Sequence, residues 1–379
     1  MISRVLLAIG LAGLMVITGC FTYVYLEARQ SKVAVAPEKP TAAIPSPHAF
    51  TLPGNLYLAQ SGALYSLSNG RFHQLTAEAG WSQPSLFPDG LLAVKRSVLY
   101  SDIYILNRFG SVVRQETVDI APRPTGADPS DYNWAFYPRL SPDSKTLWLS
   151  YDKPKYGYDV ILSVWQMPLY GSIHNGRLWT SADDYTGGDV QPIPLASGGV
   201  IYTKYSYGPD LKLVGQLWYT NRASGTYVYG HALTTPSEDC RDPALSPDGH
   251  EIAMICTYEK QVSYLAIASW DGSNLGPRTI VISNQMVAQP TWAPDGSGIA
   301  YLAPSLPDGP FQLWFLPKNA YAPPPPSPVP TPTPTPGGPY NGPLPSPSPV
   351  PTPTPVVVKP IQITTDQGFD ATSPMAWAP

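Results

Sequence analysis

Short hydrophobic and polar runs alternate along most of this chain, and turn residues separate them. The clearest example runs from Pro290 to Tyr301, where Pro294, Asp295 and Gly296 divide a Trp-containing run from a second apolar run. In a turn, Pro fixes φ, Asp accepts hydrogen bonds from nearby backbone groups, and Gly supplies a positive φ. The pattern therefore predicts two antiparallel strands joined by a tight turn.

Weakened copies of this hairpin recur along the chain. Each is anchored on a proline, and the anchors follow one another at intervals of 47–54 residues: Pro84, Pro138, Pro192, Pro243 and Pro290. The copy at Pro192 is eroded, because Ala-Ser-Gly-Gly replaces the Ser-Pro-Asp-Gly turn. A sixth, imperfect anchor is the segment Met375-Ala-Trp-Ala-Pro379. Repetition with a period of about 40–50 residues is typical of β-propellers.

Three further short runs rich in β-branched and aromatic residues follow each anchor. After Pro243 they are 251–258, 263–272 and 278–283. Each unit thus predicts a four-stranded antiparallel sheet. Such a sheet buries its faces only against neighbouring sheets, so the sequence predicts an all-β fold in which the blades are arranged radially as a β-propeller.

The two ends of the repeat region predict how the propeller closes. The globular part begins at Pro53 with runs at 53–59, 62–67 and 71–76, which supply the second, third and fourth strands of a blade. The last anchor, 375–379, supplies only a first strand. We expect the two ends to share one blade, which removes open sheet edges and gives six blades.

These anchors resemble the TolB family and related WD-like six-bladed propeller repeats, whose signature is P-x-W-S-P-D-G followed by an apolar strand. The resemblance covers about residues 53–379 and is most specific at 243–253 and 290–301. TolB carries a smaller α/β domain ahead of its propeller, and nothing in this chain matches it. The resemblance implies a propeller that binds a protein or peptide of the cell envelope, while TolB's own partners do not transfer.

The first 29 residues predict a targeting and anchoring segment. Arg4 precedes an apolar run from Val5 to Leu26, which is long enough to span a bilayer as an uncleaved signal anchor. Residues 17–20 also match a lipoprotein cleavage site, in which Cys20 is acylated. Simple secretion is a third reading. In each case the propeller lies outside the cytoplasm, and residues 30–52 form a Pro-containing tether.

A Pro/Thr/Ser-rich tract at 322–360 interrupts the last predicted blade between its third and fourth strands. Proline lacks a backbone donor, so this tract cannot join a sheet and its default state is polyproline II. It is read either as a disordered insertion or as a projecting spike whose two arms double back at its Gly-rich centre.

Composition narrows the functional classes. The net charge of −4 gives no basic footprint for nucleic acid, and only 13% of residues are charged, against about 25% in an average soluble domain.

Two cysteines flank the turn that follows Pro243. If Ser246 pairs with Glu251 across this turn, Cys240 and Cys256 fall within one residue of facing each other on adjacent strands. In an oxidising compartment we expect a disulfide, the alternative being two buried free thiols.

No nucleophile elbow, zinc motif, phosphate loop or His/Cys cluster occurs, so the sequence indicates no enzyme, no cofactor and no metal site. The Asp residues of the Pro-Asp-Gly turns are interpreted as turn-forming rather than as an acidic site. The acidic run 181–189 lacks the residue order of a calcium loop.

Residues just before the anchor prolines are expected to surround one mouth of the channel: Gln83, Tyr137, Gln191, Asp242, Gln289 and Ser373. They form either a ligand-binding ring or a set that satisfies backbone groups and water. Long loops on the same side carry the aromatic candidates Tyr132, Trp134 and Tyr156, since loops on a rigid scaffold often carry recognition.

The sequence therefore predicts a monomeric, membrane-tethered extracytoplasmic propeller that binds an envelope protein or peptide without enzymatic activity. The alternatives are a carbohydrate-binding propeller of the cell wall and a hydrolase or lyase acting in the channel.

Overall fold

The computed structural model describes residues 51–379 apart from 127, 156, 209, 225–226, 228, 258–262, 284 and 322–358. The predicted anchor at 1–29 with Cys20, nearly all of the tether, Tyr156 and nearly all of the Pro/Thr/Ser-rich insertion lie outside these residues. Within the described ranges, no helix is long or apolar enough to cross a membrane.

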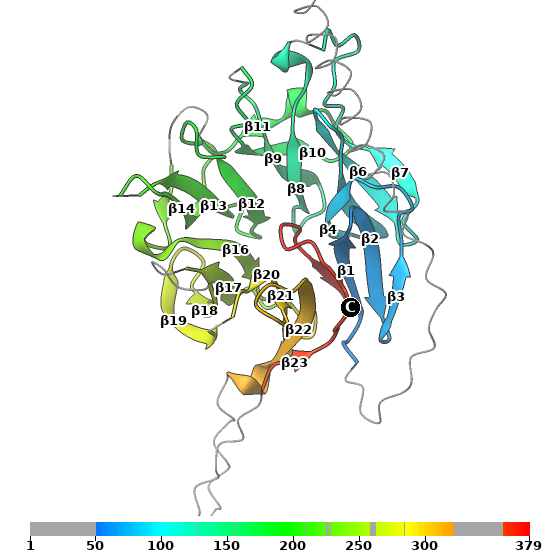
Figure 1. Ribbon diagram of the computed structural model, residues 1–379. Coiled ribbons are helices and arrows are strands. Elements are labelled where there is room, and N and C mark those ends of the chain that lie inside the picture. Colours follow the sequence, from blue (N-terminus) through cyan, green and yellow to red (C-terminus); the bar gives the residue numbers. More distant parts are fainter. Residues whose placement is uncertain are drawn as a thin grey trace, which may run out of the picture. The chain divides into compact units, whose positions relative to one another are not determined.

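Six four-stranded antiparallel sheets surround a central channel, as predicted (Figure 1). Blade 1 consists of β24 (Ala376–Ala378), β1 (Asn55–Gln60), β2 (Ala63–Ser68) and β3 (Arg71–Gln74). Blade 2 consists of β4 (Trp81–Phe87), β5 (Gly90–Arg96), β6 (Ser101–Asn107) and β7 (Val112–Gln115). Blade 3 consists of β8 (Ala135–Leu140), β9 (Thr146–Tyr151), β10 (Ser163–Pro168) and β11 (Arg177–Leu178).

The second half of the chain repeats this order. Blade 4 consists of β12 (Asp189–Pro194), β13 (Val200–Tyr207), β14 (Leu213–Thr220) and β15 (His231–Ala232). Blade 5 consists of β16 (Cys240–Leu245), β17 (Glu251–Cys256), β18 (Tyr264–Trp270) and β19 (Leu275–Ile282). Blade 6 consists of β20 (Ala288–Trp292), β21 (Gly298–Pro304), β22 (Phe311–Pro317) and β23 (Ile361–Gln362). Three-residue 3-10 helices occur at Pro129–Asp131, Ile173–Asn175, Pro236–Glu238 and Lys318–Ala320.

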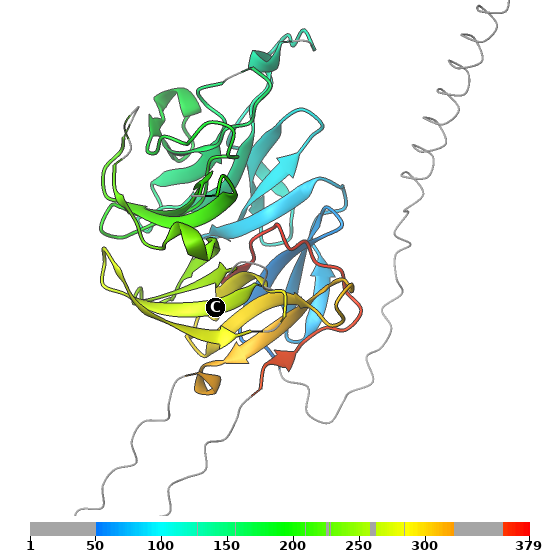
Figure 2. The same ribbon diagram turned by 60° about the vertical axis from the view of Figure 1, so that its left-hand side comes forward.

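The predicted closure is confirmed. Strand β24 pairs antiparallel with β1, and Trp377 lies opposite Leu56. In Figure 2 the red C-terminal segment lies beside the blue N-terminal strands of the propeller. The Trp377 indole Nε1 donates to the Pro53 carbonyl at 2.6 Å, and its ring meets Phe315 edge-on at 6.1 Å. Both ends of the repeat region are therefore fixed in one blade.

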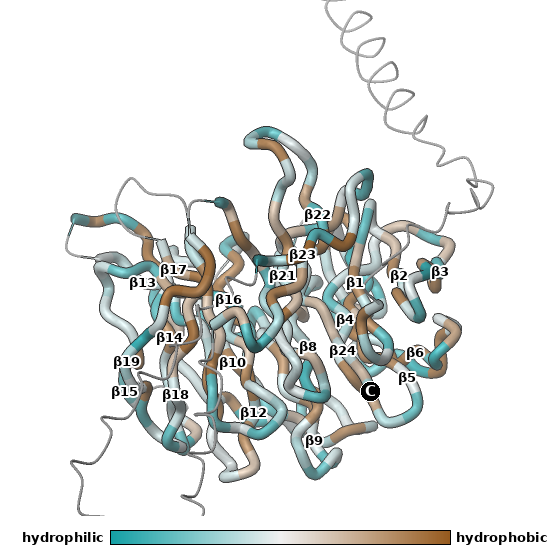
Figure 3. Tube along the Cα trace, turned by 90° about the horizontal axis from the view of Figure 1, so that it is seen from below, coloured by the Kyte–Doolittle hydropathy of each residue, from teal (hydrophilic) through white to brown (hydrophobic). Residues whose placement is uncertain are grey.

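The period-two pattern explains how the blades pack. On β17, Ile252 and Met254 face the cluster shared with blade 4, whereas Ala253 and Ile255 face the cluster shared with blade 6. One hydrophobic cluster fills each of the six blade interfaces. Hydrophilic positions gather mainly in the turns and connecting loops (Figure 3). Because both faces of most strands are covered, the core consists of these six interfaces.

Candidate functional site

The innermost strand of five blades has the same irregularity. Each of β4, β8, β12, β16 and β20 shifts register immediately before its anchor proline, as a β-bulge. The residue at the bulge has a positive φ of 50–56° in every case: Gln83, Tyr137, Gln191, Asp242 and Gln289. A positive φ is unfavourable for non-glycine residues, so its repetition at one position of five blades is a shared feature of these bulges, which redirect the side chain at that position. These five residues, with Ser373 of blade 1, are called the channel ring below.

Side chains of the channel ring bond the backbone of the next blade. The Ser373 hydroxyl accepts from the Gln83 N–H at 2.7 Å, and the Gln83 side-chain carbonyl accepts from the Tyr137 N–H at 2.6 Å. The Gln191 side chain accepts from the Asp242 N–H at 3.2 Å. The channel ring thus satisfies backbone donors that the bulges expose, and it ties neighbouring blades together.

Asp242 is the most connected member of the channel ring. Its Oδ1 accepts from the side-chain amides of Gln191 at 2.7 Å and Gln289 at 3.3 Å. The Gln289 amide also donates to the Ala371 carbonyl at 3.1 Å, which links blade 6 to the segment that leads into β24. Burial raises the pKa of the Asp242 carboxyl, although these hydrogen bonds oppose that rise.

Tyr137 differs from the other members because its side chain is a phenol. Burial, followed by the negative charge of Asp242, raises the pKa of this phenol. Its hydroxyl makes no hydrogen bond to any described residue, although the backbone N–H of the same residue is bonded to Gln83. Tyr137 therefore places an uncharged aromatic group in the channel.

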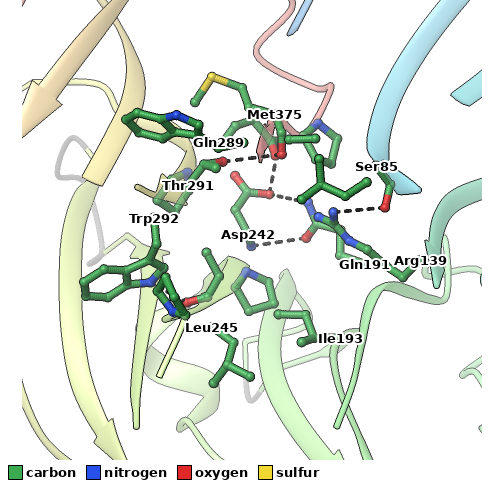
Figure 4. Close-up of a pocket in the computed structure, with 18 of the residues that line it drawn as sticks. Ser85, Arg139, Gln191, Ile193, Asp242, Leu245, Gln289, Thr291, Trp292 and Met375 are labelled. Atoms are coloured by element: carbon green, nitrogen blue, oxygen red, sulfur yellow. Dashed lines mark hydrogen bonds between the residues drawn. The ribbon is translucent and has the colours of Figure 1, made fainter. Parts of the chain in front are cut away.

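A cavity of about 440 Å³ lies in the channel beside the ring (Figure 4). Gln191, Asp242 and Gln289 contribute to its lining, and the other lining residues follow the ring positions along the inner strands, toward the Pro-Asp-Gly turns. Its walls include the anchor prolines Pro243 and Pro290. A smaller recess of about 180 Å³ is lined largely by residues that precede the ring positions or belong to the loops. The cavity of about 440 Å³ therefore lies on one side of the channel ring, and the long loops that carry the predicted aromatic candidates lie on the other.

Arg139 was not singled out from the sequence, yet it is the cation of this cavity. It follows the anchor proline of β8, and one guanidinium nitrogen donates to the Ser85 hydroxyl at 3.4 Å. Burial lowers the pKa of Arg139 to about 10, so it remains protonated at neutral pH. No carboxylate of the described residues forms an ion pair with it.

The loop aromatics are less accessible than the sequence suggested. Trp134 is half-buried: its ring stacks on Phe136 at 5.7 Å, and the Arg96 guanidinium lies 5.3 Å from its centre. Its N–H donates to Asp152 at 2.9 Å. Tyr132 is also half-buried and bridges Ile120 through the backbone. These contacts give Trp134 a packing role, and they weaken the argument for a glycan platform.

A buried acidic cluster lies at the start of this loop. The Tyr151 hydroxyl donates to Asp119 Oδ1 at 2.7 Å, while Asp119 Oδ2 has no hydrogen-bond partner in the described part of the chain. Burial, with smaller contributions from Asp102 and Asp152, raises the pKa of Asp119 to about 7. Burial likewise raises the pKa of Asp152 to about 6, despite its ion pair with Lys155. The periodic pattern of the sequence gave no sign of this cluster.

Cys240 and Cys256 lie directly opposite each other on β16 and β17, and their sulfur atoms form the predicted disulfide.

In the acidic run 181–189, the Lys204 ammonium lies 3.0 Å from Asp183 and 3.5 Å from Asp189, so the protein supplies its own cation there. The described residues contain no group of three or more side chains that could hold a metal ion.

The aspartates of the Pro-Asp-Gly turns bond their own loops, as in Asp248, which accepts from the Ser246 hydroxyl at 2.5 Å and the His250 N–H at 3.1 Å. These hydrogen bonds lower the pKa of Asp248. Such contacts fit the turn-forming interpretation.

No family model matches this chain, and no curated protein is significantly similar to it. Among solved structures, TolB from Acinetobacter baumannii is similar over 71% of this chain and 62% of its own length, with a TM-score of 0.51 and 15% identity. The chain has a TolB-like β-propeller fold. A putative TolB from Agrobacterium tumefaciens is 14% identical over 71% of this chain and 86% of its own, with a TM-score of 0.49. At these identities the likeness shows the fold alone.

The similar structures also correct one prediction. They include a puromycin hydrolase, 14% identical over 64% of this chain and 38% of its own, with a TM-score of 0.44. A prolyl endopeptidase and a periplasmic gluconolactonase from Pseudomonas aeruginosa are similar at 11% and 13% identity. The prediction that the chain is not an enzyme is therefore corrected: propellers of similarly low identity include enzymes, so the shared fold does not exclude enzymatic activity. The lack of short catalytic motifs does not separate the two classes.

Proposed function

We propose that this chain is an envelope protein whose propeller, tethered on the extracytoplasmic side of the membrane, binds a segment of a partner protein in its channel. The observation that carries the proposal is the cavity of about 440 Å³ beside the channel ring. Its volume is within the range of ligand sites, about 300–1,000 Å³. It is large enough for one or two side chains of a peptide, which suits an extended segment entering from the turn side.

The channel ring supports this role because it holds the cavity rigid before any ligand arrives. Hydrogen bonds from Gln191 and Gln289 to Asp242 fix the polar groups beside the cavity. The walls are mostly apolar and include several prolines, Met375, Trp292 and Trp377. Rigid walls reduce the entropy lost on binding, and apolar ones favour aliphatic or aromatic side chains of a partner.

The proposed location rests on the N-terminal sequence, read as a signal anchor or a lipoprotein signal. The bonded pair Cys240 and Cys256 supports it, because disulfides persist in oxidising compartments outside the cytoplasm. Fusing alkaline phosphatase after residue 379 tests the location, since that enzyme is active only when exported. An inactive fusion that is present at normal abundance would contradict the proposal.

Photo-crosslinking in intact cells tests the binding site. A photoreactive amino acid at Leu86, a lining residue with 39% exposure, is expected to crosslink an envelope protein. The matched control carries the same amino acid at Phe109, which is 69% exposed at the β6–β7 turn and does not line the cavity. Equal crosslinking at both positions, or none at Leu86, would contradict binding in the channel.

A further inference from the structure

The position after the anchor proline repeats in all blades and lines the cavity. The other blades place small, polar or apolar residues there: Ser85, Ile193, Ala244 and Thr291, with Met375 in the closing blade. Blade 3 alone places a charge there, on Arg139. Since five blades close the channel without a cation at this position, the architecture does not require one.

Half-buried Arg139 also lacks a counter-ion among the described residues. Its described polar contact is the long hydrogen bond to Ser85, and no described carboxylate lies within ion-pair distance. Arg139 is half-buried, and a partly desolvated charge without a counter-ion is less stable than a paired one, so a ligand that supplies a counter-charge would stabilise it.

Asp242, which lines the same cavity, does not neutralise Arg139. Its Oδ1 is bonded to Gln191 and Gln289, and the described residues show no ion pair between its carboxylate and Arg139. Asp242 belongs to the ring beside the cavity, whereas Arg139 lies two residues further along its strand than the ring residue Tyr137. The cavity therefore offers a cationic position that is separate from the anionic one.

We propose that Arg139 binds a carboxylate of the partner segment, either an Asp or Glu side chain or a free C-terminus. This inference rests on the proposed channel binding and adds the chemistry of the ligand. A guanidinium presents a planar pair of donors that matches a carboxylate, and the apolar walls around it strengthen the pairing by excluding water. The surrounding prolines, Trp292 and Met375 would contact the apolar groups beside that carboxylate.

The test is a peptide-display selection on the full-length chain in detergent, using random 12-residue peptides with free or amidated C-termini. We expect the peptides enriched on the wild type to share one acidic position or to require the free C-terminus. Replacing that acid by its amide, or amidating that terminus, should weaken binding at least tenfold. The same change should have no effect on Arg139→Gln, while Arg139→Lys should keep part of the affinity.

Two further variants separate this inference from the proposed function. Thr291→Trp and Ala244→Phe place bulk in the cavity, and thermal unfolding shows which of them folds. Suppose that the selected peptides bind a folded blocking variant more weakly than the wild type, but need neither an acidic residue nor a free C-terminus. This result overturns the carboxylate inference and leaves channel binding intact. Peptides that bind wild type and every folded blocking variant equally overturn channel binding itself. If removing the acidic group lowers peptide affinity equally for the wild type and for Arg139→Gln, the role of Arg139 is also overturned.

Discussion

The closing strand gives the sharpest test of the architecture, through the substitution Trp377→Ala. Trp377 is 5% exposed, packs in the cluster between blades 6 and 1, and donates to the Pro53 carbonyl. Removing a buried Trp side chain costs about 3–5 kcal/mol, and the unpaired carbonyl adds about 1 kcal/mol. We therefore expect the free energy of unfolding to fall by about 4–6 kcal/mol.

Urea unfolding followed by tryptophan fluorescence and circular dichroism measures this loss. Trp377→Phe keeps most of the packing but loses the hydrogen bond, so it should cost about half as much or less. Phe109→Ala, at a 69% exposed aromatic residue, is the control and should change stability by at most about 0.5 kcal/mol. A loss below about 1 kcal/mol for Trp377→Ala would refute the idea that this strand holds the propeller closed.

Three other substitutions test the ring, the acidic cluster and the cysteine pair. Gln83→Ala should be less stable than Gln83→Gly by about 1 kcal/mol in thermal unfolding, because alanine keeps the cost of φ +52° and glycine does not; equal stability would refute backbone strain there. The pKa of Asp119 is about 7 in the folded state and about 4 in the unfolded state, so between these values the folded state holds a proton that the unfolded state loses. The free energy of unfolding of the wild type should therefore fall, relative to that of Asp119→Asn, by about 1–3 kcal/mol as the pH rises from 5 to 7. Parallel pH profiles in urea unfolding would contradict this. Replacing both Cys240 and Cys256 by Ser should lower the free energy of unfolding by about 2–4 kcal/mol, while an unchanged urea midpoint under non-reducing conditions would argue against a stabilising bond.

The sequence was sufficient to predict the fold because its information is periodic. The anchor prolines marked each inner strand, and the incomplete units at Pro53 and Trp377 indicated that the two ends meet. The same periodicity pointed to the residues of the channel ring. Their positive φ and bulges could not be predicted, because four of the five bulge residues are Gln or Tyr, which rarely adopt that backbone conformation and so give no sequence signal for it.

The chemistry of the cavity was missed because it depends on a departure from the repeat. Aligning the residue after each anchor proline would have shown Arg139 as the one charge among six blades. Asp119 lies in a long connection outside the repeat, and its burial results from tertiary packing around Tyr151. Loop aromatics such as Trp134 looked accessible because a sequence does not show which loops fold back on one another.

The pairing of Leu56 with Trp377 also has a consequence for biogenesis. The first blade stays incomplete until residues 376–378 have been synthesised, so the nascent chain exposes the edge of β1 until then. Joining segments 321 positions apart also carries a high entropy of loop closure and slows folding. A polypeptide that closes so late keeps an unpaired strand edge exposed while it folds, and such an edge favours aggregation until β24 pairs with it.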